Sequence, residues 1–324
     1  MIRSMYSGIS GLKNFQTKLD VIGNNISNVN TYGFKKGRTI FKDLISQSVS
    51  GASGATNTRG GVNPKQVGLG SQLSAIDTIH GGGSTQSTGN TLDLAISGDG
   101  FFQVADGVNI DPATTTGTFS NPSYTRAGNF YMDKNGYLVD GNGKYLIGYA
   151  ATGWDGTSAT VDASYPDDDS VTSAGAKDNL DSDNDGIPDV ALTNAANAAY
   201  SPIRIPTNAQ SMGIGQDGTV TFVDADGQLK WAGQLVLAKF PNPGGLNKIG
   251  QNYFQKSANS GEPFNQVGTT EGVGSVNSGF LEMSNVDLSE EFTDMIVAQR
   301  GFQANTRIIT TSDQILEELV NLKR

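Results

Sequence analysis

Hydrophobic side chains recur every seven residues at both ends of this chain, whereas the residues between the ends follow a different pattern. Near the N-terminus the two columns of this repeat are Met5, Leu12, Leu19 and Ile26, and Gly8, Phe15, Ile22 and Val29. Near the C-terminus the column is Leu288, Met295, Phe302, Ile309 and Leu316. A sustained seven-residue repeat is typical of helices that pack lengthwise against other helices. We expect the two ends to pair with each other, with other copies of the chain, or with both.

The N-terminal repeat predicts a helix over residues 2–29 within a segment 1–34, and Gly33 could end that helix in a left-handed conformation. The C-terminal repeat predicts a helix from about Asp287 to Lys323 within a segment 285–324, with Asp287 and Glu290 as a capping pair. Each glycine inside the first helix costs roughly 1 kcal/mol relative to alanine. We therefore expect both helices to be disordered in the free monomer and to become ordered by packing.

Short apolar runs separated by turn residues fill most of the chain between the helices. Residues 35–75 are rich in Gly, Ser and Thr and predict an extended connector, with strands beginning near Leu73. Alternation and turn dipeptides such as Asn135-Gly136 predict β structure over 76–149 and again over 201–284. Residues 150–200 have few large apolar residues and predict an inserted lobe or loop. The predicted fold class is mixed and mainly β, with coiled-coil-forming terminal helices flanking a β-rich middle domain with a small inserted lobe.

Charge and composition narrow the classes of function. The formal net charge is −10, and no basic patch accompanies it, which argues against nucleic-acid binding. The chain contains no cysteine, which excludes disulfides and thiolate chemistry. No apolar run predicts membrane insertion, and the opening residues lack the pattern of a cleaved secretory signal.

One acidic segment invites a metal-site interpretation. Asp181, Asp183, Asp185 and Asp189 have the spacing of the first ligands of a calcium loop, although Leu192 replaces the final glutamate. The alternatives are a shorter calcium loop and a solvated acidic turn, and no other cofactor is predicted. His80, the only histidine, lies among polar residues without a catalytic motif, so the chain is not predicted to be an enzyme.

Four segments, in order along the chain, resemble motifs of the flagellar axial proteins, the family of rod, hook and hook-associated subunits. They are GNNISNVNTYGFKK (23–36), ISGDGFFQV (96–104), YTRAGNFYMDKNGYLVDGNG (124–143) and GFLEMSNVDLSEEFTDMIVAQRGFQANTRIITTSDQIL (279–316). The first motif places the family residues at Asn24, Asn25, Asn28, Thr31, Gly33 and Phe34. The opening 25 residues are most similar to short hook proteins of Gram-positive bacteria.

The resemblance implies a subunit that polymerises into a curved, flexible tube, the flagellar hook, through its terminal helices. The implied assembly residues are Met5, Leu12, Phe15, Leu19, Ile22, Ile26, Val29, Leu288, Met295, Phe302, Ile309 and Leu316. The implied partners are many copies of the chain, the distal rod below, the hook-associated junction protein above, the hook cap protein and the flagellar type III export apparatus. The implied location is extracellular. A distal rod subunit is the alternative within the family, and a calcium-dependent β-rich surface adhesin is the alternative outside it.

Overall fold

The computed structural model describes residues 2–108, 118–150, 201–225, 227–270 and 272–322. The chain divides into two compact units. The helical unit comprises residues 1–29, 35–79 and 286–324, and the β unit comprises residues 30–34 and 80–285. Mainly β structure between two terminal helices confirms the predicted fold class.

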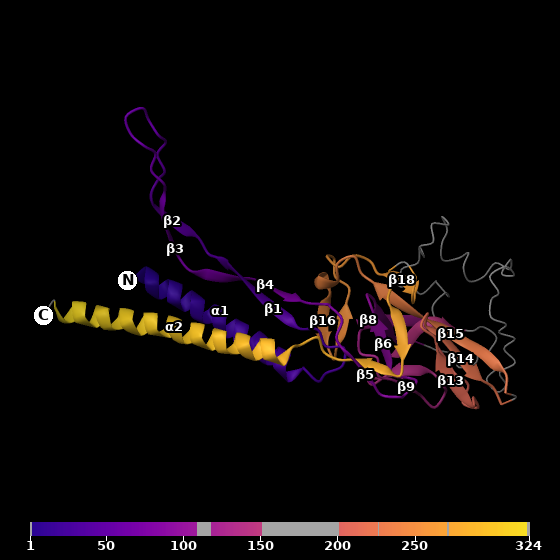
Figure 1. The fold of residues 1–324 in the computed structure, drawn as a ribbon. Helices are drawn as coiled ribbons and strands as arrows, with labels where there is room; N and C mark the ends of the chain where they lie inside the picture. Colours follow the sequence, from indigo (N-terminus) through magenta and orange to yellow (C-terminus); the bar gives the residue numbers. More distant parts are fainter. Residues whose placement is uncertain (1, 109–117, 151–200, 226, 271, 323–324) are drawn as a thin grey trace. The chain divides into compact units, whose positions relative to one another are not determined.

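The helical unit contains two long helices that lie side by side in Figure 1, α1 (Ile2–Ser27) and α2 (Leu288–Asn321). They match the predicted helices to within two residues at each end. Asp287 is the N-cap of α2, because its carboxylate accepts hydrogen bonds from the backbone N–H groups of Ser289 and Glu290. The predicted cap is therefore confirmed, while the Glu290 carboxylate accepts a hydrogen bond from Lys36 Nζ at 2.7 Å.

The rest of the helical unit is a long β-hairpin, where the sequence predicted an extended connector. β1 (Gly37–Asp43) pairs antiparallel with β4 (Ser71–Thr78), and β2 (Ser46–Ser50) pairs with β3 (Lys65–Gly68). Bridges from Ser53 to Val62 and from Thr56 to Arg59 continue the ladder toward the tip. The prediction that strands begin near Leu73 was wrong. Residues 42–68 are exposed on both faces, so their strands lack the alternation that a half-buried strand shows.

The β unit is built on one large sheet of predominantly antiparallel strands in the order β13-β14-β15-β11-β7-β8-β17-β16. The strands of the unit are β5 (Thr85–Ser87), β6 (Leu94–Ser97), β7 (Phe101–Val108), β8 (Thr118–Thr125), β9 (Phe130–Met132), β10 (Leu138–Asp140), β11 (Tyr145–Ala150), β12 (Ser201–Pro202), β13 (Ser211–Ile214), β14 (Thr219–Val223), β15 (Leu229–Lys239), β16 (Asn247–Gly250), β17 (Tyr253–Gln255), β18 (Phe264–Val267), β19 (Ser275–Ser278) and β20 (Phe280–Glu282). A single 3₁₀ turn, Pro243–Gly245, precedes β16.

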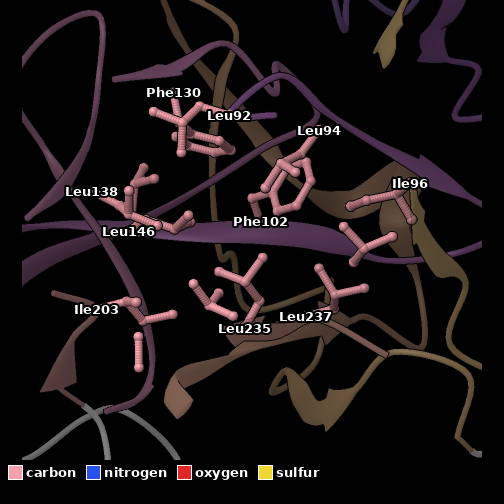
Figure 2. Packing of buried hydrophobic residues seen from close by; sticks show 14 of the residues in the cluster. Leu92, Leu94, Ile96, Phe102, Phe130, Leu138, Leu146, Ile203, Leu235 and Leu237 are labelled. Carbon is pink, nitrogen blue, oxygen red and sulfur yellow. The ribbon is translucent and has the colours of Figure 1, made fainter. Parts of the chain in front are cut away.

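The main core of the β unit lies around β7 and β15. Figure 2 shows Phe102 beside Phe130, and their rings meet edge to face with centroids 5.2 Å apart. Leu92, Leu94 and Ile96 are all buried in this cluster.

Two similar turns within the predicted β structure connect β9 to β10 and β10 to β11. Gly136 and Gly143 have φ values of +87° and +80°, as the Asn-Gly dipeptides predicted. In each turn an aspartate fixes the loop, because Asp133 Oδ1 accepts from two backbone N–H groups at 2.8 Å and Asp140 Oδ1 accepts from two at 2.8 and 3.0 Å. The sequence signal is therefore the whole pattern Asp-x-Asn-Gly.

β11 ends at Ala150 and β12 begins at Ser201, and residues 151–200, including the four candidate calcium ligands, lie outside the described residues. β11 and β12 pair directly, Ile147 with Pro202 and Gly148 with Ser201. The segment 151–200 is therefore attached at both ends to a pair of hydrogen-bonded strands.

Replacing residues 151–200 with a four-residue Gly/Ser linker should leave the β unit folded, because the pairing of β11 with β12 does not need the segment. We expect the midpoint of thermal unfolding, followed by near-UV circular dichroism, to shift by no more than a few degrees. Inserting the same linker between Ile147 and Gly148, inside the ladder, is the control that should unfold the sheet. Loss of cooperative unfolding in the first variant would contradict the prediction.

Candidate functional site: the helix pair and the Asn25 cluster

The helices α1 and α2 run antiparallel and approach closely where side chains are small. Asn25 contacts Glu291, Lys18 contacts Asp294, and Phe15 lies against Gly301, so residue numbers rise along one helix as they fall along the other. A Cβ atom added at Gly301 would lie 2.5 to 2.9 Å from three atoms of the Phe15 ring. Gly301 would weaken α2 as an isolated helix, but its lack of a side chain permits α2 to pack against Phe15.

The centre of the α2 face that meets α1 is a column of small or polar residues with seven-residue spacing. Its members are Glu291, Ala298, Asn305 and Ser312, of which all but Asn305 are buried. The Asn305 side chain lies against Gly11, and a Cβ atom added at Gly11 would come within 3.0 Å of it. Sequence reasoning missed this column because it weighed apolar residues and left polar ones aside.

The apolar columns predicted as assembly residues lie beside that centre. On α2, Leu288 and Phe302 are more than a third exposed, and Met295, Ile309 and Leu316 are half-buried. On α1 only Ile22 is fully buried, while Met5, Leu12, Phe15, Leu19 and Ile26 are half-buried. Val29 follows the end of α1 and is not helical. The single chain therefore covers these columns only in part.

Further large apolar side chains on the helices are exposed. They are Tyr6 and Ile9 on α1, and Phe292, Ile296, Val297, Ile308, Ile315, Leu319 and Val320 on α2. Scattered exposed apolar residues are ordinary, but a concentration of them on two neighbouring helices marks an interaction surface. We call this set, with the half-exposed columns, the helix-pair surface.

Asn25 joins three elements of the helical unit through one side chain that is 1% exposed. Its Nδ2 donates to the carbonyl of Gly37 at 2.9 Å and to Glu291 Oε2 at 3.1 Å, while its Oδ1 accepts from the N–H of Gly37 at 2.9 Å. The amide thereby satisfies both backbone groups at the start of β1 and holds the first turn of α2.

The other residues of the first motif have distinct positions. Asn28 donates through Nδ2 to the backbone and side-chain oxygens of Asn24, both at 2.9 Å, where α1 ends. In the β unit, the N–H of Phe34 donates to the carbonyl of Thr31, and Gly33 has a φ of +68°. The predicted left-handed glycine is confirmed, but it does not cap α1, which ends six residues earlier at Ser27.

Gly33 instead lies against the backbone of the β unit. A Cβ atom at Gly33 would come within 2.5 Å of the Ala127 nitrogen, and the Gly33 N–H donates to the carbonyl of Glu282 at 2.8 Å. Phe34 is buried beside it, with Lys248 Nζ 5.2 Å from its ring centroid. One motif thus supplies Asn25 to the helical unit and Gly33 to the β unit.

The charges near Asn25 are arranged around a buried carboxylate. Burial raises the pKa of Glu291, the hydrogen bond from Asn25 and the charge of Lys36 oppose that rise, and Glu290 and Asp294 add to it. Lys36 pairs with Glu290 at 2.7 Å and Lys18 with Asp294 at 3.3 Å. Both pairs have an exposed carboxylate, so each contributes little to stability.

No group of three or more metal-binding side chains occurs in the described residues, which do not include Asp181, Asp183, Asp185 and Asp189. His80 does not have the polar surroundings predicted for it, because its ring lies edge-on to Phe101 and Phe254 at 5.6 and 5.2 Å. The two long helices that the structure describes both lack the apolar stretch that a membrane span requires.

Comparison with known proteins identifies the class. Three family descriptions match, namely "Flagella basal body rod protein" over residues 5–35, "Flagellar hook protein FlgE/F/G D1 domain" over 95–222 and "Flagellar basal body rod FlgEFG protein C-terminal" over 277–322. The chain is therefore a structural subunit of the flagellum and not an enzyme, which removes the adhesin alternative.

Relatives that match over their whole length support the same conclusion. The chain is 50% identical over 326 residues to the flagellar basal-body rod protein FlgG of Bacillus subtilis. It is 35% identical over 455 residues to the flagellar hook protein FlgE of Borreliella burgdorferi. Each alignment covers 100% of this chain and 100% of the relative. The crystal structure of Helicobacter pylori flagellar hook protein FlgE2 matches 69% of this chain and 47% of its own with a TM-score of 0.21, too low to carry an argument. The chain belongs to the flagellar rod and hook protein family.

Substituting leucine for Gly301 should weaken the helix pair, because the new side chain meets the Phe15 ring, at a cost of about 1–3 kcal/mol. Gly23→Leu is the matched control, since nothing lies within 4 Å of a Cβ atom there and leucine favours helix by about 0.8 kcal/mol over glycine. Thermal melting of the circular dichroism signal at 222 nm, recorded on the polymer, measures both. Equal effects of the two substitutions would contradict the packing described.

The stability of the helix pair should fall as the pH rises through the folded-state pKa of Glu291. Because that pKa lies above the ordinary value, the folded state binds a proton more tightly than the unfolded state, and stability is greatest below the unfolded pKa. Glu291→Gln should remove this dependence and stabilise the pair at pH 7. Urea unfolding of the polymer at several pH values tests this, with Glu317→Gln, an exposed position on α2, as a control of equal charge change. An unchanged pH slope in Glu291→Gln would contradict the assignment.

Proposed function

We propose that the chain is the subunit of the flagellar hook, and that it polymerises through the helix-pair surface into a curved tube that transmits motor torque. The observation that carries this proposal is the array of exposed apolar side chains on α1 and α2. Packing against helices of neighbouring copies would remove these side chains from water, at about 25 cal/mol for each Å² of apolar area buried.

The composition of the α1–α2 contact suits a joint that bends. Its central column is small and polar, and the neighbouring positions Gln299, Thr306 and Asp313 are exposed and polar. Polar residues in a helix seam reduce affinity and specify register. The helices would thus keep neighbouring copies in register, while β units slide past one another through wet polar contacts that exchange at little cost.

Two features suit the hook, and relatives named as rod subunits share the full-length match, over 326 and 327 aligned residues. The chain carries about 50 residues between β11 and β12 beyond what the closed sheet needs, and additional outer material is the feature by which hook subunits are expected to differ from rod subunits. The chain also matches a protein named hook protein over its full length. The 50% identity to a protein named as a rod subunit favours a distal rod subunit as the second candidate.

The proposed partners follow from the family. They are many copies of this chain, the distal rod below, the hook-associated junction protein above, the hook cap protein at the growing end and the type III export apparatus that delivers subunits without signal cleavage. The proposed location is the external segment of the flagellum. The helices would be disordered during export and become ordered as copies stack.

Electron microscopy of the purified protein at high concentration should show curved tubes. Ile296→Asp should abolish them, because Ile296 on α2 is 59% exposed and a charge there cannot be buried between helices. Leu229→Asp is the matched control on the β unit, where the side chain is 71% exposed. Wild-type protein that never polymerises, or equal loss in both variants, would contradict the proposal.

Electron tomography of cells carrying an epitope in place of residues 151–200 distinguishes the two candidates. Label on the curved external segment indicates the hook, whereas label confined to the cell wall indicates the distal rod and overturns the proposal.

A further inference from the structure

Three segments of the β unit lie side by side where its chain continues into residues of the helical unit. They are residues 30–34, 80–84 and 281–285. The N–H of Gly33 donates to the carbonyl of Glu282 at 2.8 Å, and the N–H of Met283 donates to the carbonyl of Ser84 at 2.8 Å. We call this arrangement the three-segment junction, with residues 281–285 in its middle.

A buried ion pair underlies this junction. Arg126 Nη1 lies 3.3 Å from Glu282 Oε2, and the side chains are 3% and 1% exposed. The other carboxylate oxygen, Oε1, accepts from the N–H of Gly83 at 2.9 Å. Arg126 Nη2 donates to the carbonyl of Gly98 at 2.7 Å, and its Nη1 also donates to the carbonyl of Ile96 at 3.4 Å. The side chains of Arg126 and Glu282 thereby connect the backbone at Gly83 and at residues 96–98 with their own two segments.

Stability alone does not account for this pair. Removing two charges from water carries a large penalty, and well-packed apolar residues of similar size are often as stable or more so. The distance of 3.3 Å between Arg126 Nη1 and Glu282 Oε2 is long for a charged pair, and Arg126 Nε has no hydrogen-bond partner among the described residues. What the pair provides, and apolar residues would not, is a defined partner for the backbone of each segment.

All four segments that resemble the flagellar axial family meet at this pair. The first contributes Gly33, the second contributes the carbonyls of Ile96 and Gly98, the third contributes Arg126 and the fourth contributes Glu282. The second segment also places the Phe101 ring under the guanidinium, 5.3 Å from its carbon. Motifs that span more than 240 residues of sequence thus share one location in the β unit.

We propose that Arg126 and Glu282 form a clamp that holds the three-segment junction in register, so that axial force on the terminal segments is resisted at this point and does not open the sheet. Glu282 is the positioning residue, because its carbonyl accepts from the N–H of Gly33 and its carboxylate accepts from the N–H of Gly83 while it pairs with Arg126. The mechanical role rests on the proposed hook function, whereas the clamp itself does not.

Hydrogen exchange of the purified full-length chain, read by mass spectrometry, tests the clamp. In Glu282→Gln we expect exchange in peptides 30–35, 81–88 and 280–286 to accelerate about tenfold or more, while β15 is unchanged. Asp224→Asn is the matched control, because Asp224 and Lys230 form another largely buried pair, at 2.8 Å, away from the junction. Unchanged exchange at the junction, or equal acceleration in β15, would overturn the clamp.

The double variant Arg126→Met/Glu282→Met keeps the test decisive if the single variant fails to fold. It removes both charges of the pair together, so the sheet should form, but the junction peptides should still exchange faster than in the wild type. Wild-type exchange in this variant would overturn the clamp.

The mechanical role is tested in cells with rotating and with paralysed motors. Cells carrying Glu282→Gln should retain intact hooks when the motor is paralysed and lose them when it rotates in viscous medium. Equal loss under both conditions would show an assembly defect and overturn the mechanical role. Failure of the hook assignment would appear separately, as label inside the cell wall, and would leave the exchange result standing.

Discussion

Close approach of α1 and α2 depends on positions that carry little or no side chain. Gly11 meets Asn305 and Gly301 meets Phe15, so the line of contact runs through small and polar residues. This constraint determines where the apolar columns lie. Because the centre of the contact is occupied by the column of Glu291, Ala298, Asn305 and Ser312, the large apolar side chains are displaced to the flanks and remain partly exposed. A helix pair with a conventional leucine seam would have buried them and left little for other copies to bind.

The first motif contributes residues to both units within one short stretch of chain. Asn25 organises the start of β1 and the start of α2 within the helical unit, and Gly33, eight residues later, anchors to Arg126 and Glu282 within the β unit. Both residues are constrained by backbone geometry: the amide of Asn25 matches a donor and an acceptor of Gly37, and Gly33 has no room for a Cβ atom. Neither role depends on the surface chemistry of the residue, so substitution at either position should disturb architecture before it disturbs assembly contacts.

Much of this fold could be predicted from the sequence because its signals are local. The heptad columns identified both helices, Asp287 identified the start of α2, and Asn135-Gly136 identified a turn. The hairpin over residues 37–78 was not predicted, because its residues 42–68 are exposed on both faces and strands of that kind carry no periodic pattern. The polar column of α2, the environment of His80 and the pairing of Arg126 with Glu282 also escaped, because each depends on residues brought together by the fold. Long-range partners of a polar residue leave no periodicity in the sequence.

The direct pairing of β11 with β12 has a consequence for how such a subunit can diversify. The last residues before the inserted segment and the first residues after it are ladder neighbours, so the segment's two attachment points are close whatever it contains. Loop-closure entropy grows only logarithmically with length, so longer or shorter replacements there carry similar thermodynamic penalties. The outer face of a polymer could therefore change its bulk, charge or antigenic character through this one position, while the packing that joins the copies stays the same.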